Sequence, residues 1–559
     1  MRFLACLAAS GLLPSLFSGV TAAPSAHSLS KRCTNSAADR SCWGDYDLST
    51  NYYDEVPDTG VTVEVYLELV NTTASLDGVE REVLLVNGTF PGPTIIADWG
   101  DTVVVHLYNG LSNNGTSLHF HGIRQNYTNQ NDGVASITQC PLAPGESITY
   151  TWRATQYGSS WYHSHFALQA WEGVLGGIII NGPATANYDE DAGVLFLNDW
   201  THETADAMYT AAETSGPPTL DNGLINGTNV YDTEGSRFEM DFVSGTSYRL
   251  RLVNGAIDTM FKFMIDNHTM EVIAMDFVPI VPYNTTYLNI GMGQRYDVIV
   301  TANQSTADYW MRAIPQTTCS DNDSADNIKG IIRYDSTSTS DPTTSAYTYT
   351  DSCDDEDMSD LVPYLALDAS DSDVSDDFAV TVGKSGSLFK WFVASTTFVA
   401  EWDNPTLLQI YDGNDTYTTA SHVIELATAD EWVYFIIETT NTVPHPIHLH
   451  GHDFSILAQG TGTYATVDPT LQLTNPPRRD VAMLPGGGYL VIGFQTDNPG
   501  AWLMHCHIGW HTSEGFALQL VERASEVTAL IDDTILSDTC TAWNSYVSSS
   551  GVAEDDSGI

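Results

Sequence analysis

Hydrophobic and β-branched residues occur in short runs separated by turn residues, and helical periodicity is scarce. The runs are Val61–Val70, Thr102–Tyr108, Ser147–Arg153, Val174–Ile180, Tyr248–Val253, Tyr296–Thr301, Trp432–Thr439, Tyr489–Phe494 and Phe516–Val521. Runs of this length and spacing predict strands, and many short strands are typical of β-sandwich or barrel domains. The pattern therefore predicts an all-β protein.

The chain is long enough to place these strands in several domains. A chain of 559 residues is too long for one core, and it suffices for three or four domains of roughly 150 residues. Residues 174–183 read as a last strand that closes a first domain. Residues 336–377 are rich in Ser, Thr and Asp and predict a linker into a third domain. We expect consecutive domains at 33–183, 184–360 and 361–559, without a strict sequence repeat.

The first residues are typical of a secretion signal. Arg2, the apolar run from Phe3 to Phe17 and small residues near position 22 predict a signal peptide at 1–22. The dibasic Lys31-Arg32 predicts the end of a propeptide at 23–32. Ten Asn-x-Ser/Thr triplets fit a secreted glycoprotein: Asn71, Asn87, Asn114, Asn126, Asn226, Asn267, Asn284, Asn303, Asn322 and Asn414. No later segment has the roughly 18 apolar residues of a membrane span. We expect a soluble, extracellular protein.

Composition and net charge limit the classes of binding partner. Hydrophobic content of 42% predicts a packed globular protein. The 20 Lys and Arg against 71 Asp and Glu give a formal net charge of -51. Such a surface repels nucleic acid and anionic membrane and favours cationic or neutral partners. Adaptation to acid surroundings explains the same charge without any partner.

The cysteine count predicts one unpaired cysteine. Cys6 leaves with the signal peptide, so seven of eight cysteines remain and one is expected to be unpaired. Cys506 is the candidate, because it lies between two histidines. The other six can form three disulfides in an oxidising compartment.

Ten of the sixteen histidines lie in four segments, two near the end of the first domain and two near the end of the chain. The segments contain His119 and His121; His163 and His165; His445, His448 and His450; and His505, Cys506, His507 and His511. Side chains at i and i+2 of a strand share a face, so each His-x-His pair presents two imidazoles together. Cys506 must then point away from His505 and His507. The first and third domains are expected to meet at this site.

The residue types favour copper. A thiolate with two imidazoles is the blue-copper pattern, for which Cys506, His445 and His511 are the natural set. The remaining eight histidines divide as three, three and two, which suffices for three further copper ions. Zinc takes four ligands in a closed site, far fewer than eleven. A lone His-x-His is usually structural, but four with a cysteine inside one are not expected by chance.

In this order the segments resemble the multicopper oxidases, and within them the fungal laccases of ascomycete type. The resemblance covers nearly all of the mature chain and includes residues 87–93, 99–101, 475–480 and 497–502. It implies three cupredoxin-like domains and four copper ions. Phenolic or aromatic amine substrates would be oxidised at a type 1 copper. A trinuclear cluster would reduce O2 to water.

The resemblance also implies roles residue by residue. The type 1 copper would be bound by His445, Cys506 and His511, the type 2 copper by His119 and His448, one type 3 copper by His121, His163 and His507, and the other by His165, His450 and His505. Electrons would pass from Cys506 through His505 and His507. The implied disulfides are Cys33–Cys42, Cys140–Cys540 and Cys319–Cys353.

Four further positions have implied roles. Phe516 stands at the axial position of the type 1 site and cannot coordinate, which raises the copper potential; core packing explains it equally. Asp258 matches a substrate-pocket carboxylate that accepts the phenol proton beside His511. Asp101 matches an acid near the cluster, or is only a turn residue. Residues 556–559 resemble a C-terminal plug of the channel to the cluster, or are a frayed tail.

Two alternatives remain open. The first is a ferroxidase or other metallo-oxidase, or a pigment-pathway oxidase acting on melanin precursors rather than on lignin phenols. The second is a copper-binding protein without turnover, against which the complete ligand set argues. We expect a monomer.

Overall fold

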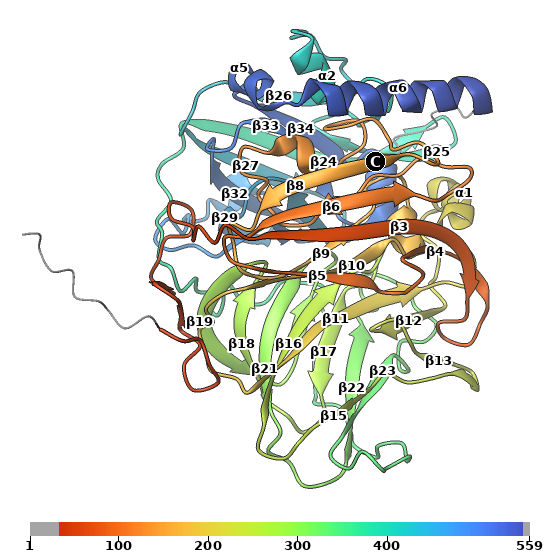
Figure 1. Cartoon of the computed structure of the whole chain (residues 1–559), viewed down its shortest axis with the longest axis vertical. Helices are drawn as coiled ribbons and strands as arrows, with labels where there is room; N and C mark the ends of the chain where they lie inside the picture. The colour runs from red at the N-terminus through yellow and green to blue at the C-terminus, as the bar shows by residue number, and fades with distance from the viewer. Residues whose placement is uncertain (1–32, 552–559) are drawn as a thin grey trace, which may run out of the picture.

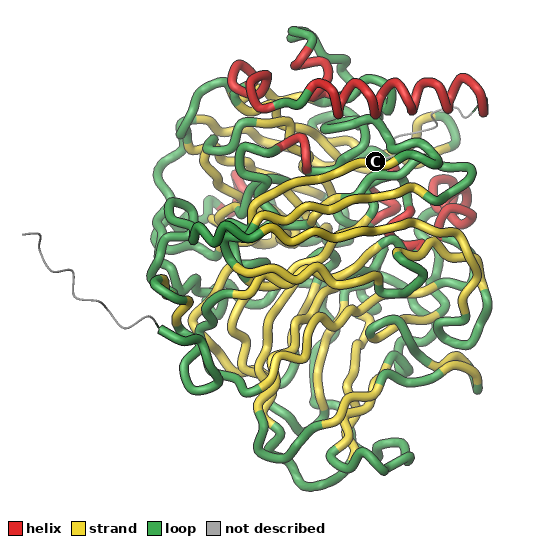
Figure 2. The backbone as a smooth tube through the Cα atoms, viewed as in Figure 1, coloured by secondary structure: helices red, strands yellow, loops and turns green. Residues whose placement is uncertain are grey.

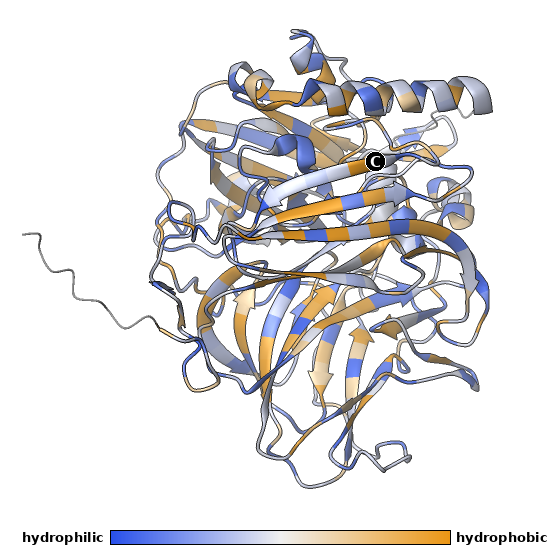
Figure 3. Cartoon of the chain, viewed as in Figure 1, coloured by the Kyte–Doolittle hydropathy of each residue, from blue (hydrophilic) through white to orange (hydrophobic). Residues whose placement is uncertain are grey.

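The computed structural model describes residues 33–551, which form a β-rich molecule of three domains (Figures 1 and 2). The predicted signal peptide (1–22), propeptide (23–32) and C-terminal plug (556–559) lie outside the described residues. Each domain is built from two sheets. Hydrophobic and hydrophilic residues alternate along several of their strands (Figure 3). The all-β, cupredoxin-like architecture is confirmed.

The first domain has two four-stranded sheets. One contains, in spatial order, β4 (Arg81–Val86), β3 (Thr62–Ala74), β6 (Thr102–Asn109) and β8 (Ser147–Arg153). The other contains β5 (Gly92–Asp98), β10 (Leu175–Asn181), β9 (Gly158–His163) and β7 (His119–Phe120). In β6 the side chains of Val103, Val105 and Leu107 are fully buried while their neighbours are more exposed, which is the alternation expected of a sheet with one covered face.

The second domain lies below the other two in Figure 1. Its six-stranded sheet is β12 (Asn222–Ile225), β11 (Glu190–Trp200), β16 (Ser247–Asn254), β21 (Arg295–Thr301), β18 (Met270–Met275) and β19 (Val278–Thr285). Its five-stranded sheet is β15 (Glu239–Asp241), β23 (Lys329–Arg333), β22 (Asp308–Pro315), β17 (Phe261–Ile265) and β20 (Leu288–Ile290).

The third domain repeats this six-plus-five arrangement. One sheet is β25 (Leu388–Val393), β24 (Val374–Ser385), β27 (Trp432–Thr439), β32 (Gly488–Gln495), β29 (Phe454–Thr461) and β30 (Arg478–Arg479). The other is β26 (Val423–Leu426), β34 (Ala517–Glu522), β33 (Gly500–Cys506), β28 (His445–Leu449) and β31 (Val481–Leu484). Two small hairpins lie outside these sheets, β1 (Cys42–Trp43) with β2 (Tyr46–Asp47) and β13 (Val230–Tyr231) with β14 (Glu234–Gly235).

All nine predicted strands are present, and the linker needs one correction. The run predicted at Ser147–Arg153 coincides with β8, and that at Trp432–Thr439 coincides with β27. The predicted linker at 336–377 extends too far, because β24 already begins at Val374 and pairs with β27. In this strand Phe378 is buried and its neighbour Asp377 is exposed, as expected of a strand with one covered face.

Helices are few, and the longest was not predicted. They are α1 (Ala205–Ser215), α2 (Thr406–Tyr411), α3 (Tyr464–Val467), α4 (Gly509–Ser513), α5 (Ala524–Val527) and α6 (Asp533–Ser550). Helix α6 crosses the top of the molecule in Figure 1 and buries only Leu536, Thr539, Cys540 and Trp543. A stripe this narrow in a Ser/Thr-rich sequence gives a weak helical pattern. Within residues 33–551, no helix is long and apolar enough to span a membrane.

Candidate metal centres

Eight histidines from the four His-x-His pairs gather between the first and third domains. His119 of β7 lies opposite His163 of β9, and His448 of β28 lies opposite His505 of β33. Across the domains, the ring centroids of His119 and His450 are 4.0 Å apart, and those of His121 and His448 are 3.9 Å apart. All eight are buried. The sequence prediction that these pairs meet at a domain junction is confirmed by the structure.

Two glycines let the chain approach this cluster. Gly122 follows His121 with φ +74°, and a Cβ there would lie 2.3 Å from the Arg295 guanidinium. Gly293, with φ +82°, comes from the second domain, and a Cβ there would lie 2.9 Å from the His507 ring. Both positions need the left-handed backbone region and leave no space for a side chain.

Hydrogen bonds on one ring nitrogen orient most of these histidines. Nδ1 donates to a backbone carbonyl in His119 (Asp132, 2.8 Å), His448 (Asp480, 2.8 Å), His163 (Ser164, 3.0 Å) and His505 (Cys506, 2.9 Å). Carboxylates accept from the other two bonded rings, Asp132 from Nδ1 of His450 at 2.9 Å and Asp480 from Nε2 of His121 at 3.2 Å. A histidine that donates through one nitrogen keeps the other as a lone pair for a metal.

Several of the other ring nitrogens have no protein donor. In the described part of the chain, Nε2 of His119 and His448, Nδ1 of His165 and both nitrogens of His507 have no hydrogen-bond partner. Nδ1 of His121 faces Nε2 of His163 at 3.4 Å, and Nε2 of His450 faces Nε2 of His505 at 3.3 Å. Buried lone pairs that converge without a proton donor are costly unless a cation lies between them. The residues present therefore fit metal ions.

Burial keeps seven of these imidazoles neutral. It lowers the pKa of His121, His163, His165, His448, His450 and His507 well below the usual value, with neighbouring histidines adding to the effect, and it lowers that of His505 to about 4. Neutral imidazole is the form that binds metal. The histidines separate into triads with nitrogens within 4.8 Å of one another: His121, His163 and His507; His165, His450 and His505; and His119, His121 and His448.

A second centre lies around Cys506, the only free cysteine among the described residues. Its Sγ lies 3.6 Å from Nδ1 of His511 and 3.9 Å from Nδ1 of His445. Strand alternation places Cys506 here while the rings of His505 and His507 lie in the cluster, 5.6 Å apart. Burial lowers the pKa of His445 to about 3. These three residues form the thiolate and bis-imidazole set that copper prefers.

Aromatic rings surround this second centre. Phe516 packs against His445 with ring centroids 5.2 Å apart, and Trp391 lies 4.7 Å from the same ring. The Phe516 backbone accepts from the Cys506 amide at 3.1 Å and donates to the His511 carbonyl at 3.0 Å. Phe516 is thus held beside the ligand set and offers it no donor atom, while it also packs in the core.

The disulfides are those that the resemblance implies. The structure joins Cys33 to Cys42, Cys140 to Cys540, and Cys319 to Cys353. The second bond ties the first domain to α6 across 400 residues.

Asp258 lines a pocket of about 450 Å³ that reaches His511. The carboxylate of Asp199, at the end of β11, accepts the backbone amides of Ile257, Asp258 and Thr259 at 2.9–3.0 Å and so holds this loop. Burial, with Asp199 nearby, raises the pKa of Asp258 to about 8. The sequence prediction that Asp258 and His511 share a pocket agrees with this geometry.

Asp101 lies in a turn. Its carboxylate accepts from the Thr59 hydroxyl at 2.6 Å and from the Asp98 amide at 2.9 Å. These bonds fit the turn role, and its role toward the cluster stays a prediction.

Three charged residues at the cluster were not predicted to act there. Asp132 contacts both His119 and His450, and Asp480 contacts His121 and His448. The buried guanidinium of Arg295, from the second domain, is paired with Asp480. Asp480 ends residues 475–480, a segment that carries the family resemblance, and this could have indicated its role. Asp132 and Arg295 are single charged residues outside every such segment.

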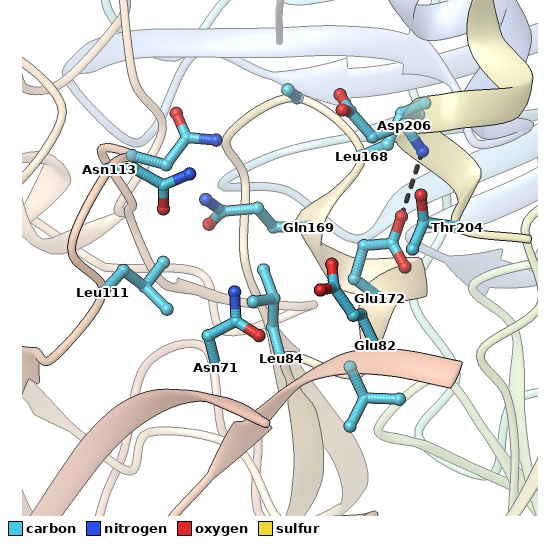
Figure 4. Close-up of a pocket in the computed structure, with 13 residues that line it drawn as sticks. Asn71, Glu82, Leu84, Leu111, Asn113, Leu168, Gln169, Glu172, Thr204 and Asp206 are labelled. Atoms are coloured by element: carbon cyan, nitrogen blue, oxygen red, sulfur yellow. Dashed lines mark hydrogen bonds between the residues drawn. The ribbon is translucent and has the colours of Figure 1, made fainter. Parts of the chain in front are cut away.

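A separate hollow lies near the start of α1 (Figure 4). Figure 4 shows Glu82, Glu172 and Asp206 on one side and amide side chains such as Gln169 on the other. Glu172 is already bonded to Arg81 at 2.6 Å and to the Asp206 amide at 3.0 Å. None of the eleven predicted ligands lines this hollow.

Comparison with known proteins agrees with this fold and site. Models of the multicopper oxidase family match residues 68–185, 191–337 and 396–526. Laccase-2 of Botryotinia fuckeliana is 50% identical over 548 residues, which cover 94% of each chain. The crystal structure of laccase from Botrytis aclada is 49% identical with a TM-score of 0.91, covering 94% of this chain and 100% of that one. Fet3p, a multicopper oxidase that functions in iron import, is 28% identical with a TM-score of 0.77, covering 89% and 97%.

The chain therefore belongs to the multicopper oxidases, whose cofactor is copper. Within that family it is an oxidoreductase of the fungal laccase type.

Proposed function

We propose that this laccase oxidises phenolic and aromatic amine substrates by one electron at a time and uses O2 as the final electron acceptor. The observation that best supports this proposal is that His505-Cys506-His507 joins two adjacent candidate metal centres. Cys506 belongs to one centre, and its two chain neighbours belong to the two type 3 sets of the other. Four copper ions bound there would supply one-electron oxidation at the first centre and four-electron reduction of O2 to water at the second.

The proposed ligand assignment follows the triads. His445, Cys506 and His511 bind the type 1 copper; His119 and His448 bind the type 2 copper; His121, His163 and His507 bind one type 3 copper, and His165, His450 and His505 bind the other. The orphaned inward nitrogens and the bonded outward ones support this assignment. His121 is distinct, because Asp480 occupies its Nε2 and leaves Nδ1 for the metal.

Protein groups handle the protons. Asp258 accepts the phenol proton as the electron leaves through His511, and its place in the same pocket supports this role. Asp101 supplies protons or orients water toward the cluster. Phe516 would offer a bound type 1 copper no donor atom, which would favour reduced copper and raise its potential.

The context of the enzyme is also proposed. The signal and propeptide patterns and the ten sequons support secretion as a glycoprotein. We also propose a monomer with domains at 33–183, 184–360 and 361–559. The C-terminal motif at 556–559 is proposed to plug the channel to the cluster. Lignin-type phenols are the proposed natural substrates.

The test is substrate oxidation by purified, copper-loaded protein. We expect rapid oxidation of 2,6-dimethoxyphenol, with about four phenols consumed per O2, and slow oxidation of Fe(II). An intense blue absorption should accompany the copper–thiolate set and vanish in Cys506→Ser. Negligible phenol turnover by fully loaded protein, or faster turnover of Fe(II), refutes the assignment.

An electron donor that releases no proton can isolate the role of Asp258. Asp258→Asn should slow the oxidation of 2,6-dimethoxyphenol and leave the oxidation rate of ferrocyanide, which has no proton to release, nearly unchanged. Equal loss with both donors would contradict proton acceptance by Asp258.

A further inference from the structure

The pocket at His511 contains a second buried carboxyl. Glu514 lies three residues beyond His511 at the end of α4, whereas Asp258 comes from the loop after β16. Both side chains line the same pocket of about 450 Å³. Glu514 is 4% exposed, so the carboxyl lies in the pocket wall rather than in bulk water.

The backbone holds Glu514 in this position. Its amide donates to the Trp510 carbonyl at 3.0 Å, and its carbonyl accepts from the Trp391 amide of β25 at 2.9 Å. Helix α1 fixes the preceding residue, because the Tyr209 hydroxyl donates to the Ser513 carbonyl at 2.8 Å. Three elements from two domains therefore place this side chain, as expected of a preorganised binding group.

Lys390 is close to Glu514 but does not cancel its effect on the pocket. Burial raises the pKa of Glu514 to about 8, although the positive charge of Lys390 acts in the opposite direction. Lys390 does not line the pocket, whereas Glu514 does, so the pocket surface keeps the carboxyl.

The pocket has an acidic side and an apolar side. Asp258, Glu514 and the exposed Asp321 line it, and no lysine or arginine does so among the described residues. Val382 and Phe389 provide part of an apolar wall. An aromatic ring fits such a wall, and the carboxyls favour donors and cations while they repel anions.

We propose that Glu514 is a second substrate-binding carboxyl that makes the pocket prefer aromatics with a positively charged tail over those with an anionic tail. This inference rests on the proposed phenol oxidation. Asp258 receives the reacting hydroxyl, and Glu514 binds the tail.

Three catechols that differ only in tail charge provide the test. They are dopamine (cationic), 4-methylcatechol (neutral) and 3,4-dihydroxyphenylacetate (anionic). Copper-loaded protein oxidises each at one fixed pH near 8, where Glu514 is about half ionised, and O2 uptake is recorded. In wild type we expect kcat/KM to fall in that order. Glu514→Gln should reduce the ratio of dopamine to 3,4-dihydroxyphenylacetate by about tenfold, the size of one charge-assisted hydrogen bond. The value for 4-methylcatechol should change little.

Two further variants separate binding from structure. Glu146→Gln removes the same charge from an exposed position just before β8, outside the pocket lining, and should leave the tail-charge ratio near the wild-type value. Glu514→Asp keeps a carboxyl and should preserve part of the ratio, which covers the case that Glu514→Gln folds poorly. Copper content and blue absorption verify each variant.

The outcomes are distinct. A common change in all three catechols, or no change, shows that Glu514 is structural and overturns the inference alone. Failure of wild type to oxidise 4-methylcatechol overturns the proposed function and the inference with it.

Discussion

Arg295→Met should remove one contact between the second domain and the metal cluster. Arg295, on β21, donates to both carboxylate oxygens of Asp480 and is fully buried. Asp480 in turn orients two predicted ligands, His121 through its carboxylate and His448 through its carbonyl. Methionine keeps most of the apolar volume and removes every donor.

Two magnitudes follow from this geometry. Loss of one partner of a buried ion pair costs about 3–5 kcal/mol, because the remaining carboxylate loses its direct ion-pair partner. Asp480 relieves part of that cost by taking up a proton, but a protonated acid is a weaker acceptor for His121. Loss of such an outer hydrogen bond lowers metal affinity by about 10- to 100-fold.

The assay combines copper retention with chemical unfolding. After dialysis against a chelator, Arg295→Met should lose cluster copper first and keep its blue absorption, because Arg295 bonds to Asp480 and not to Cys506, His445 or His511. The conservative Arg295→Lys should fall between the two proteins, since a lysine cannot donate to both oxygens. Wild-type copper retention together with an unfolding free energy within about 0.5 kcal/mol of wild type would refute the reasoning.

Three other predictions test separate features. Phe516→Met adds a thioether beside the predicted type 1 ligands and should lower the copper potential, measured by redox titration of the blue band; an unchanged or higher potential contradicts the axial assignment. Cys140→Ser with Cys540→Ser opens a loop of 400 residues and should cost up to about 6 kcal/mol, measured as a lower denaturant midpoint; equal midpoints would disprove it. Burial opposes ionisation of Asp191, but Arg251 outweighs it and lowers the pKa to about 2, so this stability is present above pH 4 and lost between about pH 4 and 2. Asp191→Asn should therefore cost about 2 kcal/mol at pH 6 and nothing near pH 2; a difference that persists at pH 2 contradicts the linkage.

Strand positions and the grouping of the histidines could be predicted from local sequence. Strand alternation alone places Cys506 opposite His505 and His507, and the structure agrees. It does so because each step along a strand reverses the side chain, whatever the rest of the fold is.

Long-range partners could not be predicted in this way. Asp132 reaches His450 across 318 residues, and Arg295 reaches Asp480 across 185. Nothing in the neighbourhood of either residue marks it, since each contact exists only after two domains have packed. Helix α6 was missed for a related reason, because its few buried residues include Cys540, which is held by a cysteine in the first domain.

The Cys140–Cys540 bond also makes most of the chain a covalent ring. A single cut anywhere between these residues, including the exposed, acidic segment before β24, leaves one connected molecule, because the two pieces stay joined through sulfur. Fragments of such a nicked protein would separate only after reduction. The protein can thus be cut once and still hold its first and third domains, and the metal centres between them, together.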